Sequence, residues 1–152
     1  MPFRPAIGDG ARIMSEAPTI PRFFDSAAQR RNRARAASGF AGFAFLKREA
    51  VLRMADRLAL MRRDFPLCLD FGCHDGMLTR EIAASGKVGQ VIQADPAPDC
   101  AAMAGAAGPA LAVEYDSLPF AAGSFDAVFS CLLLHWIDDL PGVMAQIRRL
   151  LK

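Results

Sequence analysis

The sequence predicts an α/β fold built on a parallel sheet, and three observations support this class. Two apolar runs, Leu67 to Asp70 and Val91 to Asp95, each end in an acid. A glycine-bearing turn and a helix-length interval separate them, which is the outline of a βαβ nucleotide-binding unit. A third run, 127–131, is apolar apart from Ser130, as expected for a strand covered on both faces. The pattern therefore indicates a ligand site as well as a fold.

The composition is that of one soluble globular domain, with 152 residues, of which 53% are hydrophobic and 22% charged. No apolar run reaches the roughly 18 residues of a membrane span, and the N-terminus lacks the hydrophobic stretch of a signal peptide. We therefore expect no membrane span and a cytoplasmic location. A mitochondrial transit peptide is the alternative, since Arg4 and Arg12 are present, but Asp9 and Glu16 fit it poorly.

Charge divides the chain into two parts. Residues 1–66 hold 13 basic and 6 acidic residues, a net charge of +7, whereas residues 67–152 hold 5 and 10, a net charge of −5. Residues 1–21 contain four prolines and no periodic pattern, so we expect them to be disordered. We expect 22–66 to be helical and 67–152 to carry the ligand-binding sheet.

The segment 23–37 predicts a short basic helix. Its arginines lie close together, at positions 30, 31, 33 and 35. Such a run could bind nucleic acid or an acidic carrier protein. Because no aromatic residues interleave the arginines, we expect no nucleic-acid partner and interpret the run as a solvated basic face.

A longer helix is predicted over 46–65, where apolar residues recur at steps of three and four. Pro66 is expected to close it, and the first strand, 67–71, follows. The remaining elements alternate as βαβ units require. They are a helix over 77–85, a strand over 90–94, a helix over 99–107, strands over 110–114 and 127–131, and a helix over 142–151.

The turn after the first strand carries the candidate ligand site. Gly72 and Gly76 fall where the chain must bend sharply into a helix and let a ligand lie against bare backbone. Asp95 falls 19 residues after Gly76, close to the spacing at which an acid accepts both ribose hydroxyls. His74 stands where a middle glycine is usual. Since a pyrophosphate needs close approach there, His74 argues against NAD and FAD and favours a ligand without phosphates.

The cysteines indicate neither disulfides nor a metal site. The four form no CxxC pair, and an intracellular chain of this type gives no reason to expect disulfide bonds. Cys68, Cys73, His74 and Asp75 lie close in sequence, but zinc sites need tighter pairs and a second pair elsewhere. We therefore expect reduced, structural cysteines and no metal.

Four sequence motifs resemble the first four motifs of class I S-adenosylmethionine (SAM)-dependent methyltransferases, and they fall in the family's order. They are Asp70-x-Gly72-x-x-x-Gly76, the acid Asp95, the run from Glu114 to Phe120 and the run from Ser124 to Trp136. Within the superfamily, residues 22–152 look most like the methyltransferase-like assembly factors of respiratory complex I and their bacterial relatives. The malonyl-carrier-protein O-methyltransferase of biotin synthesis is a similar neighbour.

The resemblance implies a Rossmann-like fold, a partial parallel sheet in the order 3-2-1-4, and an N-terminal helical lid that caps the SAM site. In such a site Asp70 would hold the methionine ammonium and Asp95 the ribose. Glu114 would accept from the exocyclic amine of adenine, with Asp116 as the alternative acid. The cofactor-binding residues implied in this way are Asp70, Gly72, His74, Gly76, Asp95, Pro96, Glu114, Tyr115 and Cys131.

The function implied is methyl transfer from SAM to an unidentified acceptor, either a small molecule or a protein or carrier. No catalytic residue is assigned, and we interpret His135 as a core or rim residue rather than a base. An assembly factor for a complex I subunit, acting by hydroxylation of a protein arginine, is one alternative. A non-functional fragment is the other.

The family's strands five to seven find no counterpart in this sequence. Strand 127–131 would therefore be left as an exposed apolar edge, which favours unwanted pairing with other chains. We favour a fragment of a longer protein as the explanation, and a partner that covers the edge is the alternative.

Overall fold

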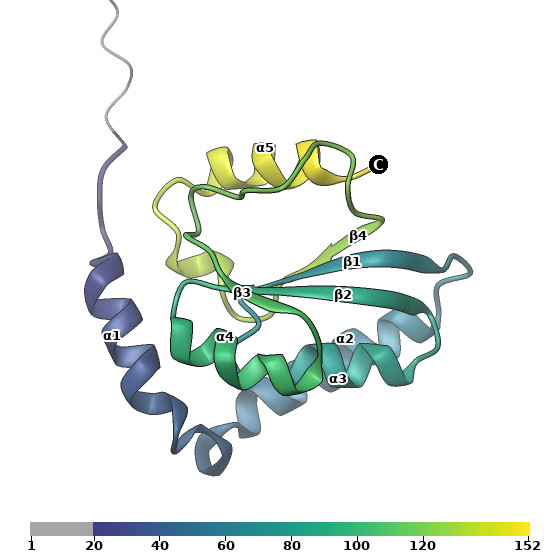
Figure 1. Ribbon diagram of the computed structural model, residues 1–152, viewed down its shortest axis with the longest axis horizontal. Coiled ribbons are helices and arrows are strands. Elements are labelled where there is room, and N and C mark those ends of the chain that lie inside the picture. The colour runs from purple at the N-terminus through teal and green to yellow at the C-terminus, as the bar shows by residue number, and fades with distance from the viewer. Residues whose placement is uncertain (1–19) are drawn as a thin grey trace, which may run out of the picture.

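A four-stranded parallel sheet organises residues 20–152, the part of the chain that the computed structural model describes (Figure 1). Its strands are β1 (Phe65–Phe71), β2 (Val88–Asp95), β3 (Ala110–Ala112) and β4 (Ala127–Phe129). The strand order is β3-β2-β1-β4, and every neighbouring pair is parallel. The predicted order is therefore confirmed. The prediction of disorder over 1–21 lies outside the described residues, except for the last two.

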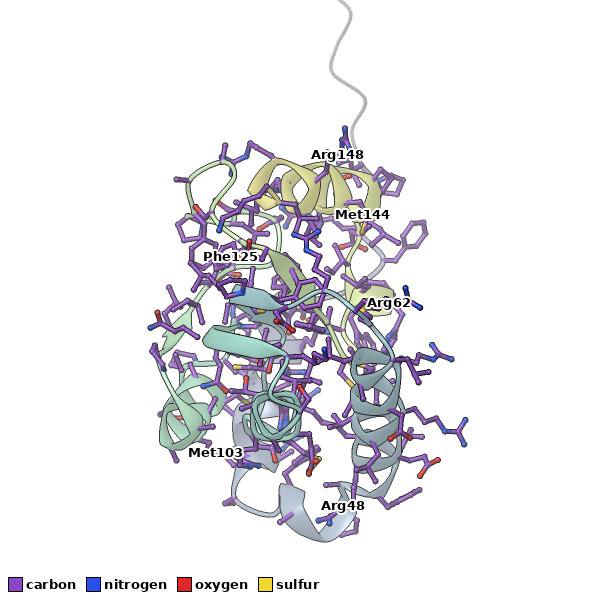
Figure 2. All side chains as sticks on the ribbon, turned by 90° about the vertical axis from the view of Figure 1, so that its right-hand side faces the viewer. Arg48, Arg62, Met103, Phe125, Met144 and Arg148 are labelled. Carbon is purple, nitrogen blue, oxygen red and sulfur yellow. The ribbon has the colours of Figure 1, made fainter. Side chains whose placement is uncertain are left out.

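The helices form two layers, one on each face of the sheet (Figure 1). On one face lie α2 (Phe45–Ala59), α3 (Met77–Ala84) and α4 (Pro98–Ala104), and on the other lies α5 (Leu140–Leu150). Figure 2 shows the same layers from the side, with Arg48 in the α2 layer and Met144 and Arg148 on α5. The remaining helix, α1 (Ser26–Ala37), stands beside α4 at the end of the sheet.

Three short 3₁₀ helices complete the described elements. They are η1 (Phe40–Phe43), η2 (Gly105–Ala107) and η3 (Leu134–Trp136). No helix in the described part of the chain is long and apolar enough to cross a membrane.

Each face of the sheet buries its own apolar cluster. Val51 and Leu58 of α2 and Ile82 of α3 pack with Cys68 and Val91 on one face. On the other face α5 packs against β1, and the buried residues shared between them are Leu69, Phe71, Val143, Ile147 and Leu150. Burial of each large aliphatic or aromatic side chain contributes about 1.5–3 kcal/mol, so the two clusters fix the layers to the sheet.

The predicted boundary between α2 and β1 is wrong. The helix ends at Ala59, and Pro66 lies inside β1 instead of closing the helix. A proline is tolerated there because it stands at the start of the strand, and β4 borders β1 only from Cys68 onward. The apolar periodicity that extended the helix in the prediction includes Met61, which lies beyond the helix and is 47% exposed.

The last helix begins two residues earlier than predicted, because Asp139 caps it. Its carboxylate accepts from the N–H of Gly142 at 2.9 Å, and Pro141 occupies the first turn. After α5 the chain turns back toward the sheet, and Leu151 forms a parallel bridge with Phe125, just before β4.

A buried glutamine ties β2 to the layer below it. Gln93 is fully buried, and its amide nitrogen donates to the carbonyl oxygens of Ala104 and Gly108, at 2.9 and 3.1 Å. These two carbonyls lie at the end of α4 and just after η2. The side chain therefore supplies partners to groups that the helix end leaves unpaired.

Candidate cofactor site

The acid at the end of β2 is fixed by backbone donors from two separate turns. Asp95 is fully buried. Its Oδ2 accepts from the N–H of His74 at 3.0 Å, and its Oδ1 accepts from the N–H of Ala97 at 3.0 Å. The guanidinium of Arg33, which α1 carries, also donates to Oδ2 and forms an ion pair with it. The carboxylate therefore has a set orientation at the carboxyl end of the sheet, where ligands bind in open α/β folds.

The turn between β1 and α3 has a left-handed backbone at every second residue. The φ angles are +87° at Gly72, +56° at His74 and +74° at Gly76. A Cβ at Gly72 would lie 2.7 Å from Cδ2 of Leu133, and a Cβ at Gly76 would lie 2.8 Å from Oε1 of Gln93. The space that a side chain needs at both glycines is thus occupied by the protein itself, not by open ligand space as the sequence suggested.

His74 shows why a glycine is usual at the middle of this turn. A left-handed conformation costs a residue with a Cβ about 1–2 kcal/mol. The imidazole is held by contact with the ring of Phe40, with centroids 3.9 Å apart. Burial, followed by the positive charges of Lys47 and Arg33, lowers the pKa of His74 to about 4. The side chain is therefore neutral at pH 7.

Lys47 is a site residue that the sequence analysis missed. Its side chain is buried, and Nζ donates to the carbonyl oxygen of Cys73 at 3.1 Å and lies 3.4 Å from Oδ1 of Asp75. These contacts brace the turn from the α2 side. In the sequence Lys47 reads as one more polar residue of an amphipathic helix, and no local signal marks it.

Asp70, the acid at the end of β1, is 1% exposed and only partly satisfied. The hydroxyl of Thr79 donates to its Oδ2 at 2.9 Å, while Oδ1 is buried without a hydrogen-bond partner among residues 20–152. Burial raises the pKa of Asp70 to about 6, against the opposing effects of the Thr79 hydroxyl and Lys47. The free oxygen is available to a donor, such as an ammonium group, directly or through water.

Glu114 and Tyr115 follow β3 and differ in burial. Glu114 accepts from Nη1 of Arg30 at 2.7 and 2.6 Å, and it is exposed. Tyr115 is buried with its ring edge-on to Phe71, and its hydroxyl has no hydrogen-bond partner. Burial raises the pKa of this phenol. The carbonyl of Asp116, the alternative acid, accepts from the amide of Gln146 at 2.7 Å.

The segment after β4 lies against the turn at Gly72. Cys131 is buried in the cluster on the α2 side, and burial raises the pKa of its thiol. Its side chain therefore packs in the core, so that only its backbone can face a ligand. Leu133 makes the close approach to Gly72. His135 is exposed, as expected for a rim residue.

Two cavities lie between α1 and the sheet. One, of about 480 Å³, is lined by residues that include Arg33, Phe40, His74 and Trp136. The other, of about 360 Å³, is lined by residues that include Glu114, Tyr115 and Trp136. The elements that bound both cavities are the carboxyl ends of the strands and α1, so they form one candidate site.

The structure brings together most of the residues singled out in the sequence. His74 and Asp95 are hydrogen-bonded, Asp70 ends the neighbouring strand, and Pro96 is buried directly after Asp95. The interpretation of the basic run as a solvated face is wrong for two of its four arginines. Arg30 and Arg33 point into the site, whereas Arg31 and Arg35 are exposed.

Comparison with known families agrees with this geometry. The family model described as "Methyltransferase domain" matches residues 69–152, which is more than half of the chain and includes the turn, Asp95 and the segment after β4. The chain belongs to the methyltransferase-domain family. Among solved structures, a SAM-dependent methyltransferase from Mesorhizobium loti is 26% identical, with a TM-score of 0.56, over 68% of this chain and 50% of that one. The predicted superfamily is therefore confirmed.

Relatives of two kinds share this methyltransferase domain. The mitochondrial arginine-hydroxylase NDUFAF5 of Homo sapiens is 38% identical over 72% of this chain and 32% of its own length. The malonyl-[acyl-carrier protein] O-methyltransferase of Gallionella capsiferriformans is 31% identical over 84% of this chain and 48% of its own. The chain thus spans about a third to a half of the length of these relatives.

The fold extends to more distant methyltransferases. A methyltransferase in complex with the activator Trm112, from Haloferax volcanii, is 23% identical with a TM-score of 0.69, over 79% of this chain and 55% of that one. At this identity the likeness concerns the fold alone.

Proposed function

We propose that this domain binds SAM and supports methyl transfer to an acceptor. The observation that carries the proposal is Asp95, a fully buried carboxylate oriented by two backbone amides at the end of β2. A carboxylate has two oxygens and about four lone-pair positions, so it can accept from two adjacent ribose hydroxyls in place of the guanidinium of Arg33. Membership of the methyltransferase-domain family supports this role.

Other side chains at the site fit the rest of the cofactor. Oδ1 of Asp70 has no partner and suits the methionine ammonium, because a positive charge beside it would stabilise the ionised carboxylate. Glu114, at the cavity on the β3 side, suits the amine of adenine, and Tyr115 is its buried neighbour. The left-handed turn through Gly72, His74 and Gly76 and the backbone at Cys131 would enclose the middle of the molecule.

The chemistry required of the protein is modest. SAM supplies a methyl group on a sulfonium, which is already activated for transfer. The chain need only orient an acceptor in line with it and exclude water, which is a proximity effect. We assign no base, since proton abstraction requires an acceptor within hydrogen-bond reach.

The acceptor distinguishes two candidate functions. The carrier-protein O-methyltransferases support methyl transfer to a small molecule or a carrier. The higher identity to NDUFAF5, named an arginine-hydroxylase, favours as second candidate a SAM-binding factor that acts on a protein arginine. Incubation with methyl-labelled SAM, candidate acceptors, O2 and a two-electron reductant separates them, because hydroxylation takes one oxygen atom from O2 and two electrons from the reductant. Label in the acceptor supports the first, and the mass gain of one oxygen atom on arginine without label supports the second.

The location of the protein in the cell also differs between the two candidate functions. A cytoplasmic location is our proposal, and the mitochondrial location in the name of NDUFAF5 supports the alternative. A protein that covers the free side of β4 remains a proposal for this chain.

Binding of S-adenosylhomocysteine, measured by titration calorimetry, tests the cofactor site. We expect Asp95→Asn to weaken binding at least tenfold, because a charge-assisted pair of hydrogen bonds is lost. Glu114→Gln should weaken it less, because its side chain is 56% exposed. Asp64→Asn, which changes a 74% exposed acid before β1 at the opposite end of the sheet, is the matched control and should leave the affinity unchanged. Wild-type affinity in the Asp95 variant would refute the proposed site.

A further inference from the structure

We propose that α1 is a latch whose arginines occupy the two nucleoside-binding carboxylates, so that the helix must release them before the cofactor can enter. This inference rests on the proposed function of Asp95 and Glu114. It departs from a lid that only closes over a bound cofactor, because here the closed helix competes with the ligand. If the basic run were only a solvated face, as predicted from the sequence, its arginines would not contact these carboxylates and could not compete with the cofactor.

The first argument is the pairing itself. Arg33 donates to Oδ2 of Asp95, the oxygen that also accepts from the N–H of His74. Arg30 lies one helical turn before Arg33, on the same face of α1, and donates to both oxygens of Glu114. The two guanidinium groups therefore donate to the same carboxylates to which the ribose hydroxyls and the adenine amine of a bound cofactor would donate.

The second argument is that, apart from its packing beside α4, α1 has few anchoring contacts. Among its residues only Ala37 is buried, so the helix has no apolar stripe to anchor it to the sheet. Its N-terminal approach is held by Asp138, whose Oδ1 accepts from the N–H groups of Phe23 and Phe24 at 2.8 and 3.2 Å. The ring of Phe24 meets Trp136 edge-on, with centroids 5.4 Å apart.

The third argument is that the docked helix is incompletely satisfied. The cavities of about 480 and 360 Å³ are both lined by residues of α1, so one side of the helix faces hollow space, although another side packs beside α4. Within the described part of the chain, Nε of Arg33 is buried without a hydrogen-bond partner. A buried unpaired donor costs free energy, so release of Arg33 to water recovers part of the energy of the broken ion pair. Such a contact is suited to being exchanged.

Calorimetry with S-adenosylhomocysteine, which has no net charge at pH 7, tests the latch. We expect the double variant Arg30→Gln/Arg33→Gln to bind it about tenfold more tightly, because the competing donors are gone. Arg31→Gln/Arg35→Gln removes the same charge from the exposed face and should bind like the wild type. Raising the salt concentration from about 0.05 to 0.5 M should tighten wild-type binding and leave the latch variant unchanged.

Amide hydrogen exchange without ligand provides a readout that does not depend on the cofactor. The latch variant should exchange faster over residues 27–37 than the control variant, since α1 is then held by fewer contacts. Asp138→Ala frees the other end of the helix and should also tighten ligand binding. Weaker or unchanged binding by the latch variant would overturn the inference. Absence of binding by wild type and all variants, with the exchange difference present, would instead overturn the proposed function.

Discussion

The ammonium of Lys47 in α2 donates to the carbonyl oxygen of Cys73, 26 residues further along the chain, at 3.1 Å. This contact joins the helix that covers the sheet to the turn that forms the candidate cofactor site. It therefore makes the shape of the turn depend on the docking of α2.

Replacement of that lysine tests the dependence. Lys47→Met keeps the length of the side chain but removes the donor to the Cys73 carbonyl and one cationic partner of the largely buried Asp75, which keeps Arg80. We expect the free energy of unfolding to fall by about 2 kcal/mol, measured by urea denaturation. In the control Lys87→Met the lost partner, Asp64, is 74% exposed, and the loss should stay below about 1 kcal/mol. Equal losses would show that burial does not strengthen the Lys47 contacts.

Gly72 should be the least replaceable glycine of the turn. Gly72→Ala combines a left-handed φ of +87° with a clash against Leu133, and we expect a loss of about 3 kcal/mol in the free energy of unfolding. Gly123 has a φ of +62°, and no atom lies within 4 Å of the position that an added methyl group would take. Gly123→Ala should therefore lose only about 1 kcal/mol, from strain alone. If urea denaturation gives the same loss for both, the contact with Leu133 is not tight.

The pH dependence of stability should show the buried carboxyl of Asp70. Burial raises its pKa from 3.8 to about 6, so the folded state prefers the neutral form. The contribution of the neutral Asp70 carboxyl to the free energy of unfolding is complete below pH 3.8 and is lost as the pH rises through about 6. Asp70→Asn keeps an acceptor for Thr79 without the charge, so we expect it to gain roughly 3 kcal/mol relative to wild type between about pH 4 and pH 8. A difference that does not change with pH would contradict this.

The buried imidazole of His74 should make the free energy of unfolding fall as the pH falls, which is opposite to the effect of Asp70. Its pKa is lowered from 6.5 to about 4, so its contribution is present above pH 6.5 and is lost as the pH falls toward 4. The variant His74→Asn tolerates the left-handed backbone and has no such titration. Wild type should lose roughly 3 kcal/mol relative to it between about pH 7 and pH 4, measured in urea. If the two denaturation series run parallel, the imidazole is already protonated in the fold.

The residues that could be predicted from the sequence lie within one local unit. The turn glycines and Asp95 share a βαβ segment, in which strand, turn and helix lengths determine where the acid returns. His74 and Asp95 are only 21 residues apart. The strand order could also be predicted, because the resemblance carried by the four motifs implies it.

The residues that sequence analysis missed depend on contacts between distant segments. Arg33 meets an acid 62 residues away, and Arg30 one 84 residues away, so neither spacing nor periodicity distinguishes them from the exposed Arg31 and Arg35. The end of α2 was missed for a different reason. Met61 continues the apolar period although it lies beyond the helix and is 47% exposed, and the following stretch has no glycine to mark the end of the helix.

The side chain of Gln93 selects one register of strand β2 relative to its neighbours. Its amide nitrogen can donate to the carbonyls of Ala104 and Gly108 only when β2 has its observed register. If the strand slid by two residues, the same face would still be presented to the helices, but both donors would be buried without acceptors, at about 1–3 kcal/mol each. One polar side chain thus selects the register of a strand whose apolar neighbours would tolerate several.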